Sequence, residues 1–373
     1  MRTSAPAMSP LHDENAVARH AVPALCCLAI TILATLPGWA ETHKIFPDQH
    51  SRNLSAQKEP ILRIKSGDSV ITRTWDSGGG DQKGIHHLKH PYVAPEGGNP
   101  LFGPFYIEDA KPGDALEVHL DRVRVNRGYG YGTSGIPDAR IKPGDTENAR
   151  DPIFAMDAVR PHRGDLVPWD IDLQALTTSP RLKPEMRSDW KIELPVRPML
   201  GTIGVGEPGQ AHEPYSPIST HGGNMDYNDV VEGATLYFPV YHEGAYFYLG
   251  DGHAQQGDGE GFGAGIETSL DVQFTVRVVK NKNLSGPRLV NDTHIVSIIN
   301  NPSEGSNTDS RIREGNSDMI RWLREECGLT KWEAHMLMGS IVEHKVVTYW
   351  TSTATLIPKR YVPARCHELQ DGK

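Results

Sequence analysis

The sequence predicts a mainly β protein, a β-sandwich followed by a smaller α+β region at the C-terminal end. From Pro60 to about residue 280, short segments rich in β-branched and aromatic residues recur, each bounded by Gly, Pro or Asp. No helical pattern separates these segments, which is typical of sandwiches and barrels. After Lys280 apolar residues recur three and four positions apart, which indicates helices.

The chain has 373 residues and a formal net charge of −9 at pH 7. This length corresponds to about two domains and allows a sizeable core. No run of Lys and Arg is long enough to follow a phosphate backbone, so we expect no nucleic-acid partner. Small molecules and metal cations are the expected ligands.

Residues 1–40 have the features of a secretory signal peptide. Arg19 and His20 precede the uncharged run "AVPALCCLAITILATL", and Gly38 and Ala40 occupy the −3 and −1 positions of a cleavage site. The alternative is a membrane anchor, but the run is shorter than the ~20 residues that a span requires. We therefore expect cleavage after Ala40, a periplasmic or secreted protein, and no membrane association after cleavage.

Two cysteines, Cys327 and Cys366, remain after that cleavage. In an oxidising compartment they could pair across a loop of about 40 residues. The sequence does not give the geometry that a disulfide requires, and we favour two separate thiols.

The expected elements follow in chain order. We assign residues 41–280 to a β-sandwich catalytic region, whose strands lie within 61–76, 114–125, 234–241, 245–251 and 269–279. Residues 233–251 read as a hairpin that turns at Glu243-Gly244. Residues 127–187 are rich in Gly, Pro and Asp, and we expect a loop-rich insertion there.

The α+β region covers residues 281–373. Helices are expected over 316–329 and 330–344, with Ser317 and Thr330 as N-caps and Gly328 as a C-cap. A strand pattern returns in residues 345–362.

Polar residues gather in four stretches. The most concentrated is "GDGHAQQGDGE", residues 250–260, whose carboxylates repel one another unless a proton or cation lies between them. The other stretches are "STHGGNMDYND" (219–229), "GAGIET" with Glu267, and "TWDSGGGDQKGIHH" with Asp76. Imidazole with carboxylate suits zinc, whereas carboxylates and carbonyls alone favour calcium or magnesium. Composition alone leaves a metal site and a solvated acidic loop equally open.

Covalent chemistry receives less support from the sequence. No GxSxG elbow is present, and no cysteine lies near the four polar stretches. Ser134 in "GTSGIP" reads as a turn serine.

The motifs "HGGNMD", "GATLYFPVYHEGAYFYLGDGHAQQGDGE" and "GAGIE" resemble the acetamidase/formamidase family. The resemblance extends upstream through "GPFYIEDAKPGDALEVHL", "PWDI" and "LPVRPMLGTIGV", and downstream through "MIRWLREECGLTKWEAHMLM". It implies a β-sandwich with an α+β part that hydrolyses short linear amides and releases ammonia. It also implies a divalent metal at the matching positions, which are His221, Asp226, Asp251, His253 and Glu260.

The chain departs from the family pattern in its Gly/Tyr-rich stretch "NRGYGYGTSGIPDARIKPGD", in its export signal and at two motif positions. Phe262 stands where many members have a cysteine, and "VEHK" at residues 342–345 replaces "GDLR". Phe262 excludes thiol chemistry at that position.

We therefore predict a metal-activated water mechanism, with zinc as the expected metal and calcium as the alternative. The predicted ligands are His221, Asp226 and Asp251, then His253, with Asp76 as an outer member. Glu260 is the predicted general base, because it can move a proton from water to the leaving nitrogen. Asn224 is the predicted oxyanion donor.

Two alternatives to a short-amide hydrolase remain. One is a non-catalytic exported binding protein of the same fold, which the changes at Phe262 and Glu343 favour. The other is a hydrolase of larger or cyclic amides, which the long stretch after Arg127 favours. The family resemblance, together with exposed hairpin edges that need cover, also leads us to expect a homodimer or higher oligomer.

Overall fold

The computed structural model describes residues 40–46, 48–89, 98–133, 159, 163–301, 303, 306–349 and 351–372. The predicted signal peptide, apart from Ala40, lies outside these residues, as do Ser134 and much of the predicted insertion. From Ala40 onward the chain forms one compact unit.

Two of the sheets form the sandwich. The larger runs β1-β3-β14-β5-β12-β15-β16-β18-β17 and the smaller β11-β10-β13-β4-β2. The larger sheet contains β1 (Thr42–Lys44), β3 (Ser69–Arg73), β5 (Ala115–Val125), β12 (Thr235–Pro239), β14 (Leu270–Val279), β15 (Arg288–Val290), β16 (His294–Asn300), β17 (Glu343–Thr348) and β18 (Ser352–Pro358). The smaller contains β2 (Leu62–Ile64), β4 (Leu101–Ile107), β10 (Met199–Gly204), β11 (Gly222–Asn224) and β13 (Phe247–His253).

The main hydrophobic core lies between these two sheets. It combines side chains of the larger sheet, such as Val118 and Phe274, with side chains of the smaller sheet, such as Phe105 and Phe247. The ring of Phe274 packs edge-on against Phe105 and Phe247, with centroids 5.2 and 5.1 Å apart. The predicted β-sandwich is therefore confirmed.

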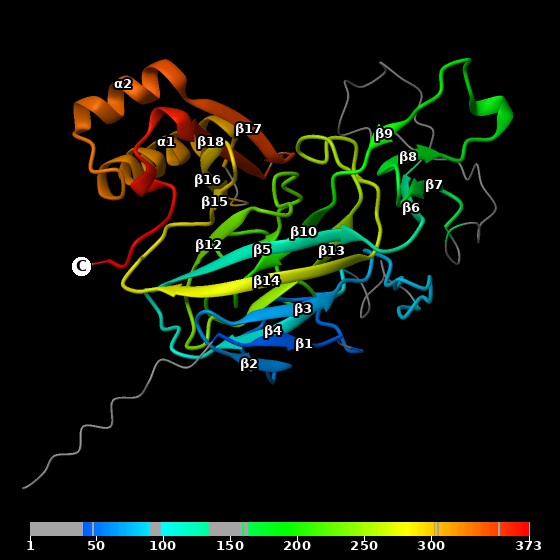
Figure 1. The fold of residues 1–373 in the computed structure, drawn as a ribbon, viewed down its shortest axis with the longest axis horizontal. Helices are drawn as coiled ribbons and strands as arrows, with labels where there is room; N and C mark the ends of the chain where they lie inside the picture. Colours follow the sequence, from blue (N-terminus) through cyan, green and yellow to red (C-terminus); the bar gives the residue numbers. More distant parts are fainter. Residues whose placement is uncertain are drawn as a thin grey trace, which may run out of the picture. The chain divides into compact units, whose positions relative to one another are not determined.

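The two α-helices cover the outer face of the larger sheet. Figure 1 shows α1 (Thr308–Glu325) and α2 (Lys331–Ile341) beside β15, β16, β17 and β18. Because side chains alternate along a strand, Ile295 of β16 faces the helices while Val296 faces the sandwich core. Trp322 of α1 is completely buried in this second core.

The helix starts were only partly predicted. Thr330 caps α2 in a capping box with Glu333, as expected. The N-cap of α1 is Asn307, ten residues before the predicted Ser317, which lies inside the helix and donates to the carbonyl of Arg313. Gly328 lies beyond the observed C-cap Glu326, with a φ of 69° that a glycine accepts at a helix end.

The predicted hairpin at residues 233–251 is wrong. β12 belongs to the nine-stranded sheet and β13 to the five-stranded sheet. The chain crosses between the sheets at Gly244, Ala245 and Tyr246, which all have positive φ. Both strands are rich in buried side chains, and this pattern alone does not tell a hairpin from a crossover.

The region predicted as a loop-rich insertion contains strands. A third sheet, β6-β7-β8-β9, consists of β6 (Tyr129–Thr133), β7 (Leu166–Asp172), β8 (Thr177–Pro180) and β9 (Leu194–Pro195). The frequent Gly and Pro hid these strands, because both residues are uncommon in sheets. Residue 280 is also not a structural boundary, since β15 to β18 continue the larger sheet.

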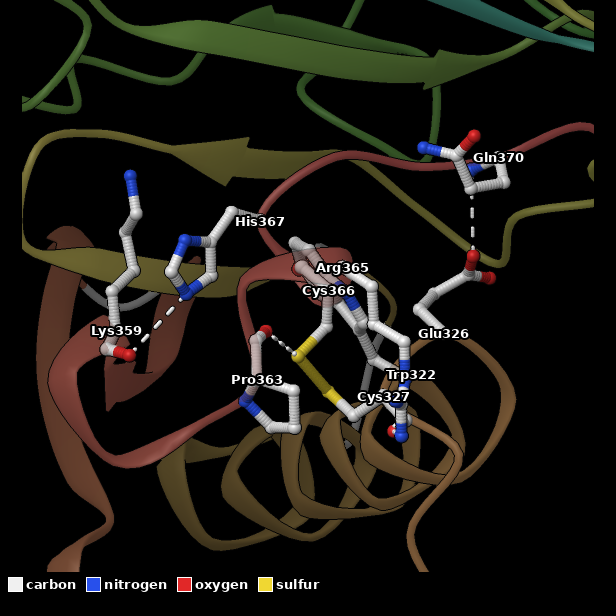
Figure 2. Close-up of a disulfide and its surroundings, with 9 residues drawn as sticks. All are labelled: Trp322, Glu326, Cys327, Lys359, Pro363, Arg365, Cys366, His367 and Gln370. Atoms are coloured by element: carbon white, nitrogen blue, oxygen red, sulfur yellow. Dashed lines mark hydrogen bonds between the residues drawn. A yellow bond between two sulfur atoms is a disulfide. The ribbon is translucent and has the colours of Figure 1, made fainter.

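A disulfide joins Cys327 to Cys366, which corrects the preference for separate thiols. Their Cα atoms are 4.7 Å apart across a sequence separation of 39, within the range that a disulfide requires. Figure 2 shows that the bond links the end of α1 to the C-terminal segment, next to Trp322. Neither helix in the described part of the chain has the length and hydropathy of a membrane-spanning segment.

Candidate metal and active site

The stretch "GDGHAQQGDGE" begins as the last part of β13. This strand lies between β10 and β4 and is buried throughout. It carries Asp251 and His253, which are 2 % and 1 % exposed. The chain then leaves the sheet and turns at Gly257–Gly263, where it presents Glu260. The charged residues of this one segment therefore lie partly inside the sheet and partly in the turn that follows it.

Gly201 of β10 makes room for the carboxylates that converge here. A Cβ atom at Gly201 would lie 2.5 Å from Oδ2 of Asp251 and 2.6 Å from Oδ1 of Asp226. It would also lie 2.9 Å from Cε1 of His253. Three polar side chains from two motifs therefore meet over one glycine.

Two overlapping groups of side chains have the spacing of metal ligands. One consists of Asp226, His253 and Glu260, and the other of Asp251, His253 and Glu267. Within each group the ligand atoms all lie within 4.8 Å of one another. His253 is common to both, so the groups form one continuous polar site.

The backbone at this site is strained. Asp226, Asp251 and Glu260 have φ values of 46°, 60° and 48°, in the left-handed region that glycine favours. Such conformations cost about 1 kcal/mol or more each and cluster at functional sites. Three separate carboxylates held in this way indicate a site that is shaped for a ligand.

Burial and the charges of neighbouring side chains set the electrostatics of the site. Burial raises the pKa of Asp251 to about 8, with the charge of Glu267 adding to the rise. Burial and the charge of Glu260 likewise raise the pKa of Asp226 well above its ordinary value. Burial lowers the pKa of His253, but the charges of Glu267 and Asp251 outweigh it and raise that pKa well above its usual range. The protein groups by themselves therefore need protons or a cation.

Several buried polar atoms of the site have no hydrogen-bond partner among the described residues. They are Oδ1 of Asp251, Nδ1 of His253 and Oε2 of Glu267. Leaving buried acceptors unpaired costs about 1–3 kcal/mol each, so such atoms are rare without a bound ion or water.

Three amide and hydroxyl side chains hold the carboxylates. Asn224 donates to Oδ2 of Asp226 at 2.6 Å and accepts from Nδ2 of Asn99 at 2.7 Å. The same Nδ2 of Asn99 donates to Oδ2 of Asp251 at 2.7 Å, and the hydroxyl of Thr202 donates to that oxygen at 3.2 Å. Asn224 therefore lies in the site, as predicted, but as a bridge between two carboxylate networks.

The turn that carries Glu260 is fixed from two sides. Nε2 of Gln256 donates to the carbonyl of Asp226 at 2.6 Å, which joins the two motifs directly. Lys345 of β17, one of the departures from the family pattern, forms ion pairs with Asp258 at 3.2 Å and Asp229 at 3.1 Å. A lysine therefore anchors this turn to the C-terminal hairpin.

A cavity of about 290 Å³ opens onto these groups. Its lining includes Asn224, Asp226, Asp251, Glu260 and Glu267. We call it the acidic cavity. It is large enough for a small organic substrate beside the carboxylates.

His221, a predicted ligand, belongs to neither ligand group. It precedes β11, in which Asn224 pairs with Thr202 while Gly222 pairs with Gly204. Asn224 follows His221 by three residues of extended chain, so the two residues lie roughly 10 Å apart. Burial lowers the pKa of His221 to about 4, and the nearby charges are those of Glu207 and His212. His221 is thus a neutral, buried histidine away from the carboxylates.

Asp76, the predicted outer member, also has another role. Its carboxylate forms an ion pair with Arg127 at 2.6 Å and accepts from the hydroxyl of Tyr131 at 3.2 Å. The backbone N–H groups of Gly78 and Gly80 donate to it as well. A carboxylate neutralised in this way holds the loop at residues 76–80 rather than a metal.

Sequence reasoning missed three participants. Glu267 was noticed as a polar residue but received no role, although it lies 3.0 Å from His253. Asn99 and Gly201 were not noticed, because a turn asparagine and a strand glycine are common residues without distinctive neighbours.

Comparison with known proteins supports the resemblance that the motifs predicted. Residues 210–350 match the sequence model of the Acetamidase/Formamidase family. This stretch contains Asn224, Asp226, Asp251, His253, Glu260 and Glu267. The predicted resemblance to this family is confirmed.

Two curated relatives and one solved structure extend the match. The chain is 26 % identical to the acetamidase of Mycolicibacterium smegmatis over 299 residues, which are 63 % of this chain and 70 % of that protein. It is 38 % identical to the formamidase of Methylophilus methylotrophus over 66 residues, 17 % of this chain and 16 % of that protein. The crystal structure of an acetamidase from Bacillus halodurans has a TM-score of 0.67 at 24 % identity and covers 85 % of this chain and 98 % of that one. The last likeness confirms the fold.

Proposed function

We propose that this chain, whose residues 210–350 carry the acetamidase/formamidase sequence pattern, is an amidohydrolase that cleaves linear amides and releases ammonia. The observation that carries the proposal is the convergence of Asp226, Asp251 and His253 over Gly201, beside Glu260. No described lysine or arginine bonds to either of the two aspartates. The site therefore has the donors of a metal centre, with the carboxylate of Glu260 next to them.

The residues fit a divalent metal. Asp226, Asp251 and His253 would hold it, and their mixed nitrogen and oxygen donors favour zinc over calcium. The unpaired Oδ1 of Asp251 and Nδ1 of His253 support this assignment. When bound, such a metal polarises a carbonyl and lowers the pKa of a water from ~16 toward ~7.

The protein groups supply the proton transfers. Glu260 lines the acidic cavity and takes the proton of the attacking water. It then gives that proton to the amide nitrogen, because ammonia leaves readily only when the nitrogen is protonated. Asn224 positions Asp226 and offers its amide to the developing oxyanion, a contribution of roughly 3 kcal/mol for a good donor.

The experiment measures ammonia release from formamide, acetamide and propionamide by the protein starting at residue 41. It compares the protein as purified, after chelation, and after zinc is restored. We expect activity that chelation removes and zinc restores. Glu260→Gln should keep the metal and lose about 100-fold or more in kcat. The matched control is Glu243→Gln, at an exposed turn between β12 and β13.

Full activity in a metal-free preparation would contradict the proposed metal requirement. An unimpaired Glu260→Gln enzyme would contradict the proposed role of Glu260 as the general base. Amide binding without any turnover would favour the non-catalytic alternative instead.

Two further properties belong to this proposal. The signal-peptide features of residues 1–40 and the disulfide between Cys327 and Cys366 support an exported enzyme, because disulfides persist in oxidising compartments. We also propose a homodimer or higher oligomer. Its support is a set of exposed apolar side chains on and near the third sheet, which includes Leu173, Leu176, Trp190 and Ile192. Sedimentation at micromolar concentration tests it, and a stable monomer would contradict it.

A further inference from the structure

A second cavity adjoins the acidic cavity. It has a volume of about 490 Å³, and its apolar lining includes Leu54, Leu101, Pro214, Pro217 and Ile218. We call it the apolar cavity. Arg52 is the one charged residue among its described lining residues. A cavity of this size falls in the range of about 300–1,000 Å³ that holds sizeable organic ligands.

Two side chains are common to the two cavities. Asn99 and Asn224 line both, and they are hydrogen-bonded to each other at 2.7 Å. Glu260, Asp226 and Asp251 line the acidic cavity but do not line the apolar one. The chemistry therefore lies on one side of the asparagine pair and the apolar volume on the other.

The side chain of Asn99 is itself a primary amide, and its hydrogen bonds show which partners this junction offers to an unsubstituted amide nitrogen. Its NH₂ group donates to Oδ1 of Asn224 and to Oδ2 of Asp251, both at 2.7 Å. Both hydrogens of the amide nitrogen are thus used. A substrate amide with an unsubstituted nitrogen offers the same two donors, whereas an N-alkyl amide offers one.

We propose that the preferred substrate is a primary amide with a bulky apolar acyl group, which occupies the apolar cavity while the carbonyl and nitrogen lie in the acidic cavity. This inference rests on the proposed amide hydrolysis. In the reaction a C–O bond to water forms and the C–N bond breaks, which gives a carboxylic acid and ammonia. The acyl group takes the apolar side because Glu260, which protonates the nitrogen, lies on the acidic side.

A two-carbon acyl group does not use the apolar volume. Each methylene moved from water into an apolar cavity contributes enough free energy to raise kcat/KM about threefold to fourfold. We therefore expect kcat/KM to rise along the series acetamide, butanamide and hexanamide, with phenylacetamide also above acetamide. N-methylphenylacetamide should be a poorer substrate than phenylacetamide.

Thr351→Phe is the variant that tests the assignment. Thr351 lines the apolar cavity at the β17–β18 turn, and its hydroxyl has no hydrogen-bond partner among the described residues, so none is lost. The variant should lower kcat/KM for hexanamide and phenylacetamide at least tenfold and leave acetamide within about twofold. The matched control, Thr308→Phe at the exposed first turn of α1, should keep the whole series.

The outcomes separate the two proposals. A flat or falling series with active enzyme overturns the acyl assignment and leaves the proposed function standing. If no amide is hydrolysed, the proposed function fails, and calorimetry of hexanamide and acetamide binding to the zinc-loaded protein tests the cavity. Tighter binding of hexanamide that Thr351→Phe abolishes would support the cavity assignment, and equal binding would overturn it.

Discussion

Oε1 of Glu267 lies 3.0 Å from Nε2 of His253, and both side chains are buried. The two residues are also paired as an isolated antiparallel bridge, so backbone and side-chain contacts hold the same register. A carboxylate on one ring nitrogen fixes the tautomer and orientation of the imidazole. The other nitrogen, Nδ1, is buried and has no hydrogen-bond partner among the described residues.

Glu267→Gln should lower zinc affinity about 10- to 100-fold, because the amide orients the ring but no longer supplies a charge. Competition with a chromophoric chelator measures the affinity. Glu243→Gln, at an exposed turn, should bind zinc like the wild type. An unchanged affinity in Glu267→Gln would show that Glu267 does not support His253.

Chelation should lower the melting temperature of the wild-type protein, because the buried carboxylates lose the cation that offsets their repulsion. Asp251→Asn should abolish this effect and, above the pKa of about 8 of Asp251, should stabilise the metal-free protein by about 1 kcal/mol, since it removes one of the like charges. Calorimetric melting with and without chelator tests both statements. An Asp251→Asn protein that is less stable than the metal-free wild type would contradict a destabilising repulsion between the buried carboxylates.

Gly201→Ala should abolish metal binding and activity, because the added Cβ would lie 2.5 and 2.6 Å from carboxylate oxygens of Asp251 and Asp226. Gly257→Ala is the matched control in the acidic turn. A Cβ there would meet nothing within 4 Å, so this variant should retain metal. Metal content and circular dichroism separate loss of the site from loss of the fold, and a Gly201→Ala protein with full metal would refute the crowding.

His221 should make the protein less stable in acid. Its pKa is about 4 when folded, against 6.5 as its ordinary value, because burial disfavours the charged ring. As pH falls from 6.5 to 4, the unfolded chain takes up a proton that the folded protein does not. The free energy of unfolding therefore falls by up to about 3 kcal/mol over this window.

His221→Leu isolates this contribution, since both ring nitrogens of His221 lack hydrogen-bond partners among the described residues. Urea unfolding at pH 7.5 should give the variant a stability similar to the wild type. At about pH 4.5 the variant should be the more stable of the two. An equal acid sensitivity in both proteins would assign the effect to other groups.

Removing the disulfide should destabilise the protein. A bridge across 39 residues restricts the unfolded chain by about 4 kcal/mol in the loop-entropy estimate. Cys327→Ala/Cys366→Ala should therefore unfold at a lower urea concentration than the oxidised wild type. Wild type under a reducing agent is the control and should behave like the double variant. Identical unfolding of all three proteins would mean that the bond does not constrain the chain.

The strands of the sandwich could be predicted from short segments of sequence, because the buried residues along each strand either alternate with less buried ones or form a continuous run. β5 and β14 were expected in nearly their observed positions for this reason. Which sheet each strand joins was not a local property. β12 and β13 read as a hairpin from sequence, yet the turn between them carries the chain across the sandwich.

The sequence by itself determined the β-sandwich class, the family resemblance and the two motifs that carry Asp226, Asp251, His253 and Glu260. These depend on residue types and spacings within short segments. Only the tertiary structure decided which of the polar residues meet. In the structure His221 lies away from the carboxylates of the site, and Asp76 pairs with Arg127 instead. Glu267, Asn99 and Gly201 belong to the site. The physical reason is that ligand geometry depends on the register between β10, β11 and β13, and strands far apart in sequence pair through long-range packing that no short motif encodes.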